Sequence, residues 1–183
     1  GFELVSEGDA KQIFVQPFGE IAAQSMLAMA HIIWTATWFG IAADTVVKAQ
    51  AFVKAEAKKR PGTVPPGALR LAEVSATLQQ MKSLLTAGIA RYEEALADEN
   101  LMSSLTFIAE LCTIKVSASQ LCIDICQQSL MILGLAGYRN DGPWSIARNY
   151  RDLLSAAIMI NNDRILGNTS TLLLMSKIDT AVA

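Results

Sequence analysis

Hydrophobic positions recur along most of this chain at the three- and four-residue spacing of an α-helix. Residues 18–58 predict one long helix, which is apolar nearly all round in its first half and polar in its second. Proline and glycine at residues 60–67 end it. Residues 68–97 and 101–133 each carry a single apolar stripe, so each predicts a further helix that buries one face.

A fourth helical segment starts near Trp144 and runs to residues 171–175. Asn161 and Asn162 interrupt it, because asparagine favours a cap or a turn over a helix interior. Long helices with short connections predict an all-α fold, an up-down four-helix bundle.

The first residues do not follow this pattern. Residues 1–17 begin abruptly and show no clear helical period, so we expect the tail of an upstream domain or a linker there. Residues 18–183 then form the bundle domain, whose length suits one domain.

The connection before the fourth segment is rich in glycine. Gly134 and Gly137 allow a sharp exit from the third helix, because glycine has no Cβ penalty at positive φ. Gly142 and Pro143 predict a new helix with Pro143 at its first position, where a missing N–H costs nothing. A capped loop of this kind is also what any helical bundle needs.

Composition narrows the functional classes. The formal net charge is −2, and nucleic-acid binding normally requires a basic patch, so we expect no nucleic-acid partner. Residues 26–43 carry no formal charge and just reach membrane-spanning length. Polar residues interrupt them and the helical pattern continues into Lys48 and Lys54, so a buried bundle helix is favoured over a membrane span.

The cysteines point to the cytoplasm. Their number is odd and no secretory signal precedes them, which favours free thiols in a reducing compartment. Cys122 and Cys126 lie one helical turn apart, but no third ligand is near, and His31 is the chain's one histidine. We therefore expect core thiols and no metal site.

The glycine-rich connection, together with Arg151 and Asp152 in the following helix, resembles the C-terminal domain of the acyl-CoA dehydrogenase family. The run 31–56 can also be laid on that family's first C-terminal helix without a gap, with Gly40 on the family's glycine. The order and spacing of these motifs extend the resemblance over about residues 20–175.

The resemblance implies an oxidoreductase that removes hydrogens from Cα and Cβ of an acyl-CoA thioester. A carboxylate takes the α-proton and FAD takes the β-hydride. An electron-transferring flavoprotein is the expected electron acceptor, and a homo- or hetero-oligomer is expected.

The catalytic base is where this chain departs from the family. The two family positions fall on Ile160 and Ala30, neither of which can take a proton. Asp163 is the nearest carboxylate to the first, although it equally suits a helix start beside Arg164. His31 falls on a family arginine near the thioester, where it serves as a hydrogen-bond donor or base, or as a core residue.

Of the FAD contacts that the resemblance implies, this chain has residues suited to some and not to others. The backbone amides of Gly134 and Gly137 are placed to approach adenine or pyrophosphate, and Asn162 and Arg164 fall on family residues that touch FAD. Glu56 replaces an arginine that contacts the FAD pyrophosphate, so that contact is lost or comes from Lys58 or Arg60.

Two other interpretations remain open. The missing carboxylates and the charge reversal at Glu56 also suit a catalytically silent subunit that pairs with an active dehydrogenase. A helical interaction module without a cofactor is the alternative from another class.

Overall fold

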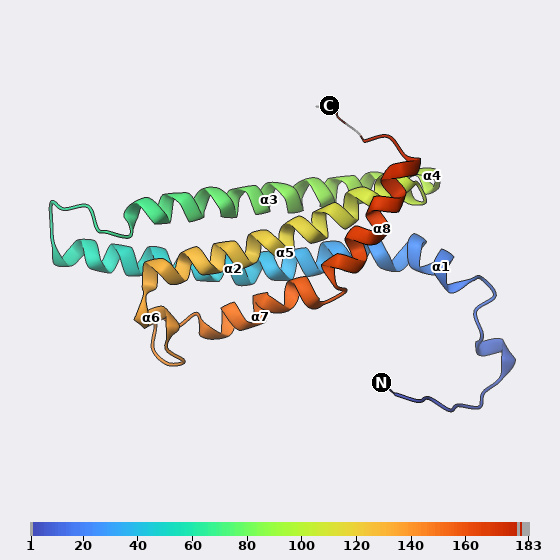
Figure 1. Cartoon of the computed structure of the whole chain (residues 1–183), viewed down its shortest axis with the longest axis horizontal. Helices are drawn as coiled ribbons and strands as arrows, with labels where there is room; N and C mark the ends of the chain where they lie inside the picture. Colours follow the sequence, from blue (N-terminus) through green and yellow to red (C-terminus); the bar gives the residue numbers. More distant parts are fainter. Residues whose placement is uncertain (1, 179, 181–183) are drawn as a thin grey trace.

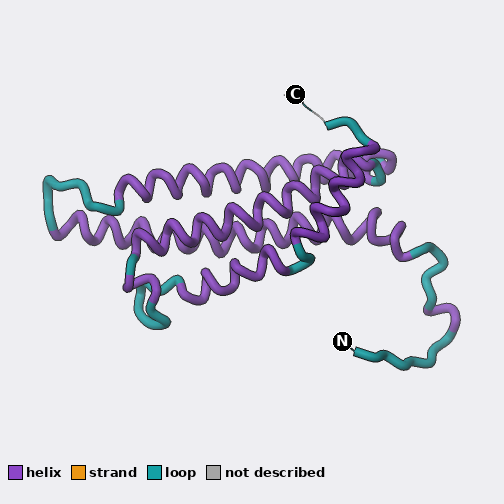
Figure 2. Tube along the Cα trace, in the orientation of Figure 1, coloured by secondary structure: helices purple, strands orange, loops and turns teal. Residues whose placement is uncertain are grey.

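The computed structural model describes residues 2–178 and 180, and this part of the chain contains helices and loops but no strand (Figures 1 and 2). The all-α prediction is confirmed. The α-helices are α1 (Phe18–Ile21), α2 (Leu27–Lys59), α3 (Ala68–Leu96), α4 (Glu99–Met102), α5 (Leu105–Leu133), α6 (Leu135–Tyr138), α7 (Ala147–Ile158) and α8 (Asn162–Met175). A short 3₁₀ turn occupies Ala10–Gln12 and a π-helical turn Ala22–Met26.

The long helices alternate in direction along the bundle, as an up-down arrangement requires (Figure 1). Helix α5 is central, because it packs against α2, α3, α7 and α8. The fourth member is divided: α7 runs back along α5, and α8 then turns off at an angle across its first half (Figure 1).

The first predicted helix forms as expected. Helix α1, the π-helical turn and α2 make one continuous run, Phe18–Lys59, close to the predicted range 18–58. It ends at Arg60, and Gly62 takes a φ of +79° in the loop that follows. The interruption predicted at Asn161 and Asn162 is also confirmed.

The predicted helix 101–133 is wrong at its start. The chain makes the separate one-turn helix α4 and then breaks at Ser103 and Ser104. The carboxylate of Asp98 caps α4 by accepting from the Asn100 N–H at 2.9 Å, and Ser104 Oγ accepts from the Phe107 N–H at 3.2 Å. Two successive N-caps therefore start two helices where the apolar stripe suggested one.

The predicted start of the fourth segment is also wrong. Helix α7 begins at Ala147, so Pro143 lies in a loop and is not the first helical residue. The Ile146 N–H donates to the Gly137 carbonyl at 3.0 Å, and Ile146 is fully buried, so the loop is pinned against α6 before the helix can start. Trp144 packs edge-on against Phe52, with ring centroids 5.6 Å apart.

The main core lies between α2, α3, α5 and α7. It includes Trp38, Ala42, Val46, Val74, Met81, Ile125 and Leu153. The three cysteines are buried and free, which confirms that they are core thiols. Burial raises the pKa of Cys122 and of Cys126 to about 12, so both stay protonated and unreactive near neutral pH.

Two helical runs, Phe18–Lys59 and Leu105–Leu133, are long and apolar enough to cross a membrane by length and composition. More than half of the most apolar window in the second run is buried inside the bundle. Core helices of bundles meet the same criterion, so these runs do not establish a membrane span.

Residues 2–17 leave the bundle as an extended arm (Figure 1). The arm carries exposed apolar side chains, among them Phe2, Leu4, Val5, Phe14 and Val15.

Candidate functional site

The first group of candidate residues surrounds the break between α7 and α8, residues 159–161, which we call the elbow. Helix α7 ends at Ile158, and the Asn161 side-chain oxygen caps α8 by accepting from the Asp163 N–H at 2.8 Å. Between them Ile160 takes a φ of +44°. The elbow thus presents the position where the resemblance expects a catalytic carboxylate.

A fully buried lysine on α5 holds the elbow from inside. The Lys115 ammonium donates to the carbonyls of Ala156 at 3.0 Å and Ile160 at 2.9 Å, and to Asn162 Oδ1 at 2.7 Å. It also lies 5.6 Å from the centroid of the Trp38 ring, within the range of a cation–π contact. Its acceptors are therefore neutral oxygens at the ends of two helices.

Lys115 forms no ion pair with a carboxylate in the part of the chain that the structure describes. Burial lowers the pKa of Lys115, because removal from water disfavours the charged form. The carbonyls at the C-terminal end of α7 offset part of this, since that end of a helix carries partial negative charge.

Asn162 belongs to this internal network. Its side-chain oxygen accepts from Lys115, and its Nδ2 donates to Ser119 Oγ at 2.9 Å. Both ends of the amide are therefore bonded inside the chain, where the resemblance placed a FAD contact.

His31 lies on α2 and is only 3% exposed. Its Nδ1 has no hydrogen-bond partner, and neither has the hydroxyl of the fully buried Thr35 one turn further on. Burial chiefly lowers the pKa of His31, the Leu111 backbone opposes the shift, and the charge of Lys115 adds to it. A neutral imidazole with an unused nitrogen therefore sits in the core.

Asp163 and Arg164 occupy the first turn of α8 and are both exposed. Asp163 is exposed whereas His31 is buried, and no hydrogen bond or ion pair joins them within the described residues. Arg164 forms no ion pair within residues 2–178, so its guanidinium is available to an external group. The catalytic and binding roles of both residues remain predictions.

The second group of candidates is the glycine turn, residues 134–137. Gly134 takes φ +57° and ψ −139° and has open space where a Cβ would point. Its N–H donates to the Leu130 carbonyl at 2.8 Å, and the Gly137 N–H donates to the Gly134 carbonyl at 3.1 Å. Neither amide is therefore free to bind a phosphate, although the exposed Gly134 backbone can still face a ligand.

Gly137 is required for packing. A Cβ there would come 2.6 Å from Leu133 Cβ, closer than real atoms approach. The glycine lets α6 fold back on the end of α5.

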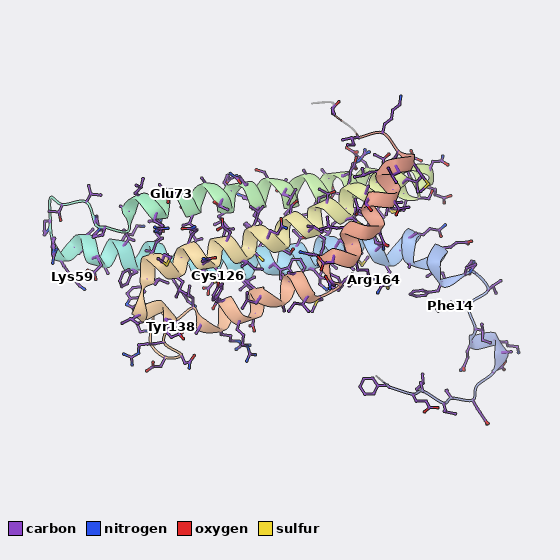
Figure 3. The ribbon with its side chains drawn as sticks, in the orientation of Figure 1. Phe14, Lys59, Glu73, Cys126, Tyr138 and Arg164 are labelled. Carbon is purple, nitrogen blue, oxygen red and sulfur yellow. The ribbon has the colours of Figure 1, made fainter. Side chains whose placement is uncertain are left out.

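The two groups lie well apart along the bundle, as the labels Arg164 and Tyr138 show in Figure 3. At about 1.5 Å per residue, the stretch of α5 from Lys115 to Leu133 is about 27 Å long. One copy of the chain therefore does not surround a single compact ligand with both groups.

Glu56 takes part in a local ion pair, with its Oε1 2.6 Å from Lys59 Nζ. This pairing reduces its negative field, but leaves no cation at the position itself. Within the described residues, no group of three or more His, Cys, Asp or Glu side chains is placed to hold a metal ion.

The sequence pattern did not lead us to predict a role for Lys115. Its signal was a charge inside an apolar stripe: Lys115 is three residues after Cys112 and four before Ser119, so it shares their buried face. A lysine on such a face needs an internal partner.

Comparison with known families gives a match that covers most of the chain: the model of "Acyl-CoA dehydrogenase, C-terminal domain" matches residues 19–168. Searches among curated proteins and among solved structures find no match. The matched range begins in α1, includes the glycine turn and the elbow, and ends inside α8. The chain therefore belongs to the acyl-CoA dehydrogenase family, as a C-terminal domain of that family's helical type.

Proposed function

We propose that this chain is the C-terminal bundle of a flavoprotein that oxidises the Cα–Cβ bond of an acyl-CoA thioester with FAD. The observation that carries the proposal is the family match over residues 19–168. The elbow adds support, because it exposes a fixed backbone position where the family resemblance expects proton abstraction.

We infer that Asp163 is the better of the two candidates for the base. It is exposed on the first turn of α8, three residues after Ile160, so a substrate can reach it. His31 is buried, and it would have to be uncovered before it could accept a proton from a substrate.

The flavin, when bound, supplies the acceptor for the β-hydride. In this chain Arg164 and the open backbone at Gly134 fit a contact with FAD, since one is an unpaired exposed cation and the other is free of side chain. Asn162 and Gly137 fit it less well, because both ends of the Asn162 amide are bonded internally and Gly137 is buried.

The same proposal includes the division of the chain into domains and the partners of the protein. Residues 1–17 would be the end of an upstream domain or a linker, and 18–183 the bundle. Exposed apolar residues on the arm and on α2, such as Phe14, Met29 and Ile33, support a covering domain or subunit. An electron-transferring flavoprotein, oligomer formation and a cytoplasmic location follow from the family and belong to the proposal.

The test is to assay the natural full-length protein with acyl-CoA esters of graded chain length and an artificial electron acceptor. Dehydrogenation is expected for at least one ester. The Asp163→Asn variant is then expected to lose about a hundredfold or more in turnover, the usual contribution of a general base.

Asp124→Asn serves as the matched control, because Asp124 is an exposed carboxylate on α5 with no bonded partner among the described residues. Equal turnover in wild type and Asp163→Asn would eliminate Asp163 as the base. A large loss in His31→Gln would instead transfer that role to the histidine.

A second candidate is a catalytically silent subunit of a heteromeric dehydrogenase. It is favoured by the residues at the two family base positions, Ile160 and Ala30, and by Glu56 being paired with Lys59. In that case the full-length protein alone turns over no ester.

Ile160→Glu distinguishes the two candidates. In a silent subunit with an otherwise intact site, it should create dehydrogenation that the wild type lacks. In an active enzyme that uses Asp163, it should raise the rate little.

A further inference from the structure

Ile160 has a backbone conformation that its own side chain does not favour. It is the non-glycine residue with positive φ in the part of the chain that the structure describes, and it is β-branched. Such residues rarely enter the left-handed region, and they stay there only when the surroundings hold them. Ile160 is 43% exposed, so packing of its side chain accounts for only part of the restraint.

Lys115, on the neighbouring helix α5, supplies a restraint from inside the bundle. It bonds the Ala156 carbonyl before the elbow, the Ile160 carbonyl within it and the Asn162 side chain after it. An ammonium group has three N–H donors, so one side chain is fully used by three acceptors that bracket the strained residue. Bonds from a charged donor are stronger than neutral ones.

An apolar residue would be cheaper to bury at this position, because it carries no charge to desolvate. It would, however, leave the buried carbonyl of Ala156 and the partly buried carbonyl of Ile160 without this donor. The lysine is therefore better explained by the geometry that it fixes than by the net stability that it adds.

We propose that Lys115 is the positioning residue of the elbow, whose ammonium holds Ile160 in the left-handed region and thereby fixes where residues 160–164 lie. The consequence for catalysis, though not the restraint itself, rests on the proposed function.

Hydrogen exchange followed by mass spectrometry on the full-length protein tests the restraint. The Lys115→Met variant keeps the length of the side chain but lacks the donors. Loss of the bonds should speed exchange in peptides covering 157–165 by roughly tenfold or more, and leave α3 unchanged. Lys82→Met, at an exposed position of α3, is the matched control and should change neither region.

A double-mutant cycle tests the strain. Ile160→Gly should raise the melting temperature more when Lys115 is present than in the Lys115→Met background. Only an elbow that Lys115 restrains forces residue 160 to keep a positive φ. An identical shift in both backgrounds, or faster exchange spread evenly over the bundle, would overturn the proposal. If Lys115→Met yields no folded protein, Asn162→Ala removes one acceptor and should give the same local change, but smaller.

Catalysis provides a separate measurement. In an active full-length protein, Lys115→Met should lower kcat while KM changes little, since the elbow and not the acyl-CoA contact is displaced. If the wild type turns over no acyl-CoA, the proposed function fails, while exchange and coupling still decide whether Lys115 positions the elbow.

Discussion

The chain leaves a helix sharply at two places, and it does so by different physical means. At the glycine turn the backbone reverses through Gly134, at φ +57°, and the bonds that stabilise it come from residues within four positions. At the elbow a β-branched residue, Ile160, takes φ +44°. The bonds that hold it come from Lys115, on a different helix.

Because they are stabilised differently, the glycine turn and the elbow should be sensitive to different mutations. The glycine turn depends on the residue type at its own position, so it should form wherever α5 ends. The elbow depends on α5 and α7 being packed together, because the ammonium reaches Ala156 and Ile160 only in the folded bundle. A change in the core should therefore disturb the elbow but not the turn.

The largest effect is expected from reversing the charge at the elbow. Lys115→Glu would bury a carboxylate against the carbonyls of Ala156 and Ile160, which repel it. An unpaired buried charge typically costs about 3–5 kcal/mol, so the free energy of unfolding should fall by that much or the protein should not fold. Denaturant titration measures it.

Lys82→Glu provides the comparison for this charge reversal, since Lys82 is exposed on α3. Its free energy of unfolding should stay within about 0.5 kcal/mol of wild type. Similar losses in the two variants would show that the elbow does not depend on the ammonium.

A smaller effect is expected at the glycine turn. Gly134→Ala places a Cβ on a backbone conformation that is nearly exclusive to glycine, and this should cost about 1–3 kcal/mol even though the space is open. Gly40→Ala, at an open helical position of α2, should instead stabilise by about 0.5–1 kcal/mol. Thermal unfolding of both variants checks the contrast, which disappears if the turn tolerates a side chain.

The smallest effect is a pH dependence of the free energy of unfolding that comes from the buried His31. Burial lowers the pKa of His31 in the folded state, so the unfolded state binds the extra proton first. Stability should therefore fall as the pH drops below about 6.5, and stay level above it as far as His31 is concerned. His31→Gln should flatten this part of the stability profile in thermal melts from pH 5 to 8, and an unchanged slope would show that His31 does not contribute.

Much of this fold could be predicted from local patterns. The apolar stripes located the helices at 18–58 and 68–97, and Asn161 with Asn162 located the break before α8. Gly134 marked the end of α5. These features are decided by residues near one another in sequence, through periodicity, capping and the absence of a Cβ.

The missed break at Ser103 and Ser104 depends on local N-caps that the apolar stripe concealed, whereas the other missed features depend on contacts farther along the chain. Pro143 favours a helix start, but the hydrogen bond from the Ile146 N–H to the Gly137 carbonyl holds this segment as a loop. Helix α7 therefore begins only at Ala147. The candidate site residues His31, Asp163 and Asn162 were identified by resemblance, yet only the structure showed that the first is buried, the second exposed and the third bonded to Lys115.

The sequence by itself determined an all-α chain, the ends of most of its helices and the family to which it belongs, because helical periodicity and motif spacing are written along the chain. Only the tertiary structure decided that Lys115 is the centre of the elbow. A lysine has no preferred partner in sequence, and its three acceptors come within 3.0 Å only when α5, α7 and α8 are packed together.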